Sequence, residues 1–189
     1  PVVYEALKKD YVQVEFYDTN VDLMPARSFH KNDFIVYNNY FGVCGGKVKE
    51  IAREYPNLII DNAQAFFADP IQGIDTFYSA RKFFGVADGA YLYTDAHLDI
   101  ELEQDQSYAR MAHLLKRADI DAEAGYADFR KNDDALCGEP IKRMSRLTEK
   151  ILCSIDYEAC KVTRRRNYEE YESALSETNV IQLHLDTHA

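Results

Sequence analysis

The chain has 189 residues, of which 47% are hydrophobic, so it is long enough and apolar enough to form one sizeable core. Its formal net charge of −10 argues against a nucleic-acid partner and against an anionic membrane surface, because both bind basic patches. No apolar run is long enough for a transmembrane helix, and no signal peptide begins the chain. These features predict a soluble, cytoplasmic protein.

The cysteines and histidines predict no metal site. The four cysteines form no C-x-x-C pair, and the five histidines are scattered along the chain. Unpaired thiols at ordinary frequency fit a reducing cytoplasm. We therefore expect neither a disulfide framework nor a bound metal ion.

The first 95 residues alternate between helical and strand patterns. Helices are predicted at 1–9, where Pro1 suits a first turn, and at 47–55. Strands are predicted at 11–17, 34–37, 58–60, 76–78 and 90–93, with polar loops at 18–33 and 38–46. Short apolar strands separated by helices indicate an α/β fold with a mostly parallel sheet.

After residue 95 the sequence becomes more polar. Residues 98–118 are charged and predicted to be helical, whereas 119–140 contain two glycines and are expected to be irregular. Residues 144–175 predict one long helix, continuous or broken, and 179–185 resemble a strand. The apolar stripe of the long helix comprises Leu147, Ile151, Ile155, Ala159 and Val162. The basic run Arg164 to Arg166 has acidic neighbours and is interpreted as a solvated helix face.

Polar side chains follow three of the predicted strands. Ligands of parallel sheets bind beyond the carboxyl ends of the strands, so Asn39 with Tyr40, Asp61 to Gln64, and Ser79 to Lys82 are the candidate site residues. A buried lysine amine can form a Schiff base, and a carboxylate can pair with a protonated ring nitrogen. From the residues alone, a structural ion pair or two unrelated surface residues would be the favoured interpretation.

The motifs around these residues resemble those of the DegT family of pyridoxal-phosphate (PLP)-dependent sugar aminotransferases. The run Asp61-Asn62-Ala63-Gln64-Ala65 is similar to the family's D-x-A-Q-A motif. The run from Lys82 to Ala90 is similar to its K-N-x-x-x-G-E-G-G stretch. Further matches, in the family's order, are Gly42, Arg143-Met144-Ser145 with Leu147, and Arg164 to Tyr171 with Leu175. The resemblance covers residues 1–178.

This resemblance implies a site and a fold. The fold would be the three-layer α/β/α major domain of fold-type I transferases. Lys82 would hold PLP as a Schiff base and act as general base, and Asp61 would pair with the pyridine nitrogen. Ala63, Gln64 and Ser79 would complete the cofactor site, with Asn39 and Tyr40 as weaker candidates for contact with substrate.

The sequence also departs from the family pattern. Phe77 stands where the family has its phosphate-binding serine, so that role is transferred to Ser79, three residues before Lys82. Asp88 replaces the usual glutamate. Ile141 stands near the position of the asparagine that reaches the partner subunit's phosphate. These departures indicate a divergent subgroup.

The family's organisation implies the remaining expectations. Residues 1–125 would be part of the PLP-binding large domain, and 126–189 would lead through an irregular segment and a long helix towards a small domain. A homodimer is expected, acting on a nucleotide-linked keto sugar with an amino-acid donor such as glutamate. The alternatives are another PLP-dependent reaction, such as dehydration or elimination, and a non-catalytic relative with a structural role.

Overall fold

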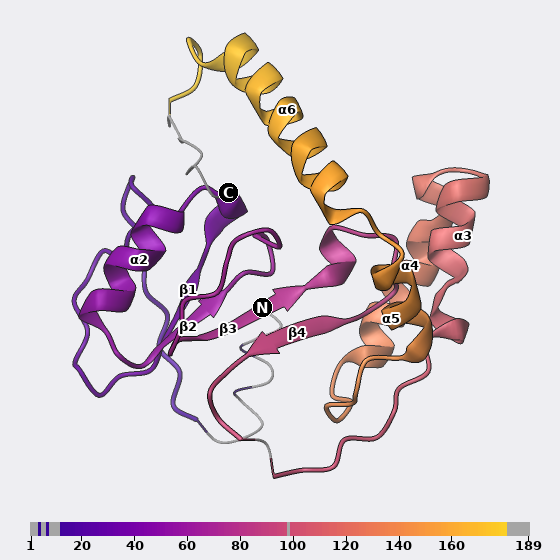
Figure 1. The fold of residues 1–189 in the computed structure, drawn as a ribbon, viewed down its shortest axis with the longest axis horizontal. Coiled ribbons are helices and arrows are strands. Elements are labelled where there is room, and N and C mark those ends of the chain that lie inside the picture. Colours follow the sequence, from indigo (N-terminus) through magenta and orange to yellow (C-terminus); the bar gives the residue numbers. More distant parts are fainter. Residues whose placement is uncertain (1–3, 5–6, 8–11, 98, 181–189) are drawn as a thin grey trace.

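The chain folds around a four-stranded mixed sheet, as seen in the computed structural model, which describes residues 4, 7, 12–97 and 99–180 (Figure 1). The strands are β1 (Ile35–Asn38), β2 (Leu58–Asp61), β3 (Asp75–Ser79) and β4 (Ala90–Tyr93), and their order in the sheet follows their order in the chain. The first three strands are parallel, and β4 runs antiparallel to β3. The prediction of an α/β fold with a mostly parallel sheet is therefore confirmed.

The parallel strands have one buried face and one half-covered face. Paired residues on neighbouring strands point to the same side of a sheet. The register therefore places on one face the buried side chains of Ile35, Tyr37, Leu58, Ile60, Thr76 and Tyr78. The opposite face carries Val36, Ile59, Asp61, Phe77 and Ser79, which are all partly exposed. The acid at the end of β2 and the serine at the end of β3 thus lie on the same face.

Helix α2 (Gly45–Glu54) covers the buried face of β1 and β2. Its residues Val48 and Ile51 join Ile35, Leu58 and Ile60 in the main apolar cluster. These positions lie three residues apart on the helix, so they face the same side, and the predicted helix is confirmed. The loop before β1 closes the cluster with partly buried Tyr17, Met24 and Phe29.

Helices α3 (Ala112–Asp119), α4 (Ala122–Leu136) and α5 (Arg146–Cys153) lie together at the opposite end of the sheet from α2 (Figure 1). Helix α6 (Tyr157–Leu175) follows α5 and runs away from these three helices. A second apolar cluster joins Leu152 of α5 to Ala80 and Val86, which flank Lys82 in the chain. No helix in the described part of the chain is long and apolar enough to cross a membrane.

Two predicted elements are wrong in the described residues. Residues 12–17 form no strand, although they are β-branched and aromatic, because they pair with no ladder, and Val12 and Phe16 are exposed. Residues 119–140 are not irregular but contain α4, which begins where the Asp121 carboxylate accepts a 2.8 Å hydrogen bond from the backbone N–H of Ala124. Gly125 does not break α4. It lies at a close contact with α3.

Other boundaries are partly correct. Helix forms only over the last third of 98–118, after an extended segment and a 3₁₀ turn, η3 (Tyr108–Arg110). The long helix is broken at residues 154–156, where Asp156 begins α6 by accepting a hydrogen bond from Ala159 N–H. The predicted helix at 1–9 and strand at 179–185 lie largely outside the described residues, and Asn179 and Val180 are not in a strand.

The apolar stripe predicted for the long helix holds only at Ile151 and Ile155, because Leu147 and Ala159 are exposed. Ile151 and Ile155 pack on the Leu152 cluster, but Val162 of α6 is 66% exposed. The face of α6 with the lower exposure instead carries Tyr157, Lys161, Arg165 and Tyr168, spaced three or four residues apart. The face of α6 that is turned to the protein is therefore polar and basic.

Candidate functional site

Acidic, amide and amine side chains meet at the carboxyl edge of the parallel strands. Asn39 directly follows β1, Asp61 is the last residue of β2, and Ser79 is the last residue of β3. Lys82 ends a 3₁₀ turn, η2 (Ala80–Lys82), that leads from β3. Since β1, β2 and β3 are parallel, all three ends lie at the same edge, as the sequence predicts.

Asp61 is held at this edge by backbone hydrogen bonds. Its Oδ1 accepts a 2.8 Å hydrogen bond from the N–H of Ala63, and its carbonyl oxygen accepts one from the N–H of Asn39 at 3.0 Å. Phe77 pairs with Asp61 across the ladder and lies on the same face. In the described part of the chain, no hydrogen-bond donor reaches Oδ2 of Asp61, so this oxygen remains available to a ligand.

The electrostatics connect Asp61 with Lys82. Burial raises the pKa of the Asp61 carboxyl above its usual range, and this is the largest effect. The hydrogen bond from Ala63 and the positive charge of Lys82 both act in the opposite direction. The Lys82 charge is the smallest of these three effects, and in the described part of the chain Lys82 forms no ion pair with Asp61 within 4.0 Å.

A buried amide pair lies beside this acid. Asn39 and Asn62 are 2% and 1% exposed, and the Nδ2 of Asn39 donates a 3.0 Å hydrogen bond to the Oδ1 of Asn62. The hydroxyl of Tyr78 donates a hydrogen bond to the carbonyl of Ala68 at 2.8 Å, and the nearby Asn62 side chain counteracts the rise in the Tyr78 pKa that burial causes. The Oδ1 of Asn39 has no partner among the described residues. A buried acceptor without a donor is costly, so this atom marks a place for a ligand or a water molecule.

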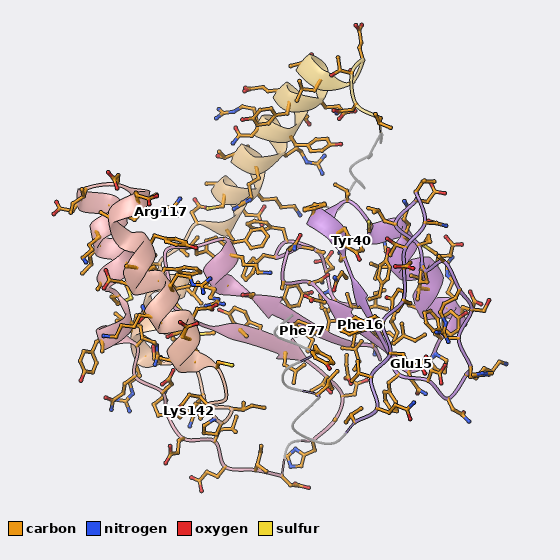
Figure 2. The ribbon with its side chains drawn as sticks, turned by 180° about the vertical axis from the view of Figure 1, so that it is seen from behind. Glu15, Phe16, Tyr40, Phe77, Arg117 and Lys142 are labelled. Carbon is orange, nitrogen blue, oxygen red and sulfur yellow. The ribbon has the colours of Figure 1, made fainter. Side chains whose placement is uncertain are left out.

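The other predicted residues lie at the same edge with different surroundings. Ala63 is buried, and Ser79 is half-buried. Gln64 is exposed and lies away from Asp61, on the wall of a cavity. The ring contacts of Tyr40 are with Tyr37 and Phe41 rather than with the acid. Figure 2 shows Tyr40 at the edge of the sheet, whereas Phe77 lies on the sheet itself.

The sequence interpretation expects a buried Lys82, and this expectation is wrong. The Lys82 side chain is exposed, so burial does not favour the neutral form of its amine. Its amine lies near the Asp61 charge in an environment that water reaches. Any desolvation of Lys82 must come from a bound ligand or a partner chain.

The sequence interpretation assigned no role to two sets of residues. Asn62 belongs to the candidate run Asp61 to Gln64, but it occupies the variable position of the D-x-A-Q-A motif. A polar cluster also connects the loop after Lys82 to α5. The Asp88 carboxylate accepts hydrogen bonds from Thr148 at 2.7 Å, from Ser107 at 3.0 Å and from Arg110 at 2.8 Å. Ser145, which caps α5 by accepting from Thr148 N–H, bonds Ser107 at 2.5 Å. The Ser-x-x-Thr spacing signals this cap but not the cluster.

The chain is an α/β domain with a mixed, mostly parallel four-stranded sheet. An acid, an amine and a buried amide pair follow the strands at the carboxyl edge of this sheet. No protein-family model, curated protein or solved structure matches the chain in the three comparisons.

Removing the charge of Asp61 is expected to stabilise the chain. Because burial raises the pKa of Asp61, its ionised form destabilises the fold once the pH is above that pKa. Asp61→Asn keeps an acceptor for Ala63 N–H and should raise the free energy of unfolding by about 0.5 kcal/mol at pH 7.5, a small gain because water screens the half-exposed group. In urea titrations the gain should shrink towards pH 4, where wild-type Asp61 becomes protonated. A gain that is equal at both pH values would contradict this explanation.

Proposed function

We propose that the chain carries the cofactor site of a PLP-dependent aminotransferase of the DegT type, which transfers an amino group to the keto group of a nucleotide-linked sugar. The observation that carries the proposal is the convergence of Asp61 and Lys82 at one edge of the sheet, where the lysine charge acts on the acid. We also propose that the complete protein has the three-layer fold-type I architecture and works as a homodimer in the cytoplasm. The motif resemblance supports these further assignments.

The residues at the edge fit the chemical groups of PLP. Asp61 has an oxygen that accepts from no described donor, as a protonated pyridine nitrogen requires. The hydroxyl of Ser79 lies at the same edge and provides a further polar contact. The exposed amine of Lys82 is accessible to an aldehyde. When bound, PLP supplies an electron sink for the carbon that carries the amino group.

Each residue of this chain then has a defined task. Lys82 Nζ holds the cofactor covalently and afterwards moves a proton at the substrate carbon as general base. Asp61 keeps the ring nitrogen protonated, and the Lys82 charge helps Asp61 remain ionised despite burial. Ser79 binds the phosphate with its hydroxyl. Gln64 would complete the cofactor site on the side of the ring's phenolic oxygen.

Borohydride reduction in the presence of PLP tests the proposal. We expect a pyridoxyl mass tag on Lys82, located by peptide mapping, because its exposed amine follows β3 at the same carboxyl edge as the acid that would anchor the ring. Lys82→Ala should lose the tag, whereas Lys150→Ala, which removes an exposed lysine of α5, should keep it. Tagging spread equally over surface lysines would overturn the proposal.

Activity of the full-length protein provides the second measurement. Amino transfer from glutamate should fall on the order of 10²–10⁴-fold or more in Lys82→Ala, since the general base is lost. Release of free ammonia in place of amino transfer would identify dehydration or elimination as the reaction. Tagging of Lys82 without either product would favour a non-catalytic role.

A further inference from the structure

A cavity of about 180 Å³ lies between α6 and two loops at the carboxyl edge of the sheet. Its walls come from the turn after β1 (41–43), the loop after β2 (64–68), Phe83, and the first half of α6 (Figure 1). The cavity neighbours the candidate cofactor site through Gln64, but neither Asp61 nor Lys82 lines it. It is therefore a separate feature, and its assignment does not rest on the function proposed above.

The charge of the cavity is opposite to that of the protein. Lys161, Arg164 and Arg165 line it from α6, and none of its lining residues within the described chain is acidic. The whole chain has 32 acidic and 22 basic residues, so three cations in one small cavity are unusual here. Lys161 lies three residues before Arg164 on α6, a spacing at which like charges on one helix repel each other. A bound anion would relieve this repulsion.

The opposite wall of the cavity is aromatic. The rings of Phe66, Phe67 and Phe83 pack together with centroids 5.6–6.0 Å apart, and Phe41 adds a 67% exposed ring. The Arg164 guanidinium lies over the Phe83 ring at 4.5 Å, which holds its charge at the aromatic wall.

The turn after β1 is bent to form this wall. Phe41 has a φ of 56°, a left-handed conformation that is unfavourable for a bulky side chain. Gly42 follows with a φ of 77°, also in the left-handed region, which favours glycine. The strained turn therefore presents Phe41 at the mouth of the cavity, and such strain concentrates at functional sites.

We propose that this cavity binds a small aromatic anion, of the size of an aryl phosphate, with its charge on the α6 cations and its ring on the phenylalanine wall. The volume sets the size of the ligand, because pockets that enclose drug-sized molecules measure roughly 300–1,000 Å³. An intact nucleotide would extend well outside the cavity. A ring with one anionic group uses both walls at once.

Phenyl phosphate is the probe for this site. Titration into the full chain at constant ionic strength, followed by ³¹P and ¹H line broadening of the ligand, should give saturable binding. Inorganic phosphate and phenol should each bind more weakly, because each uses only one wall. Phenol binding as tightly as phenyl phosphate, or no saturation at all, would overturn the proposal.

Variants of basic residues on α6 test which side chains bind the probe. Arg164→Gln and Lys161→Gln should each weaken phenyl phosphate binding roughly tenfold, the size of one lost charge-assisted contact. Arg166→Gln, on the same helix but outside the cavity, should have little effect. Lys82→Ala should also bind normally, which distinguishes this cavity from the cofactor site. Equal losses in Arg164→Gln and Arg166→Gln, or loss in Lys82→Ala, would show that the probe binds elsewhere.

Discussion

Replacing Asp88 by alanine is expected to lower the free energy of unfolding by about 3 kcal/mol. Asp88 is only 12% exposed in its side chain and forms a 2.7 Å ion pair with Arg110, which is 19% exposed. Without the carboxylate, Thr148 and Ser107 lose their acceptor and Arg110 loses one of its two partners. Breaking a buried pair by removing one partner commonly costs 3–5 kcal/mol, and the remaining pairing of Arg110 with Asp105 favours the lower end.

The pH dependence of the stability difference between wild type and Asp88→Ala is a second test of this prediction. Burial alone would raise the pKa of Asp88, but hydrogen bonds from Thr148, Ser107 and Arg110 together with the Arg110 charge outweigh it, so the pKa is lowered. A lowered carboxyl pKa stabilises the fold above the unfolded-state pKa and loses that contribution as the pH falls through the folded-state pKa. The difference between wild type and Asp88→Ala in urea titrations should therefore be full at pH 7 and decrease below about pH 4.

Asp128→Ala is the control for Asp88. Asp128 pairs with Lys116 at the surface of α4, where water screens the charges, so its loss should change stability little. If Asp88→Ala unfolded at the same urea concentration as Asp128→Ala, the polar cluster would not hold the loop after Lys82 against α5. Since Asp88 lies six residues after Lys82, a loosened cluster should also reduce the PLP tag on the lysine.

Gly125→Ala is expected to destabilise the chain by about 2 kcal/mol. A Cβ at this position would lie 2.5 Å from the backbone oxygen of His113, so α4 would have to move away from α3. Overpacking of this kind typically costs 1–3 kcal/mol, and the contacting atom belongs to the backbone and cannot rotate away. The higher helix propensity of alanine, about 1 kcal/mol, offsets only part of this loss.

Gly46→Ala provides the matched comparison, because Gly46 also lies in a helix but a Cβ there would meet nothing within 4 Å. This variant should gain a few tenths of a kcal/mol from helix propensity alone. Thermal unfolding followed by circular dichroism measures both variants. A stabilising effect of Gly125→Ala would contradict the close packing of α3 and α4.

The amino-acid sequence predicts the central sheet well. Strands such as 58–60 are short apolar runs that end in polar residues, and this pattern reflects a local preference combined with burial. Local patterns fail where a long-range contact decides the structure. Residues 12–17 have strand propensity but pair with no neighbouring strand. Gly125 resembles a helix breaker in the sequence, but in the structure it allows α4 to pack closely against α3.

The candidate site also has some features that the sequence predicts and others that appear only in the folded chain. The amino-acid sequence is sufficient to predict that a carboxylate and an amine follow neighbouring strands, because strand periodicity and the parallel order are local and topological properties. The exposure of Lys82 and the unpaired acceptor of Asn39 appear only once the chain is folded. The same holds for the Arg164 guanidinium, which lies over the Phe83 ring in the wall of the cavity. Burial, desolvation and stacking depend on residues that are distant in the chain, so no local pattern contains them.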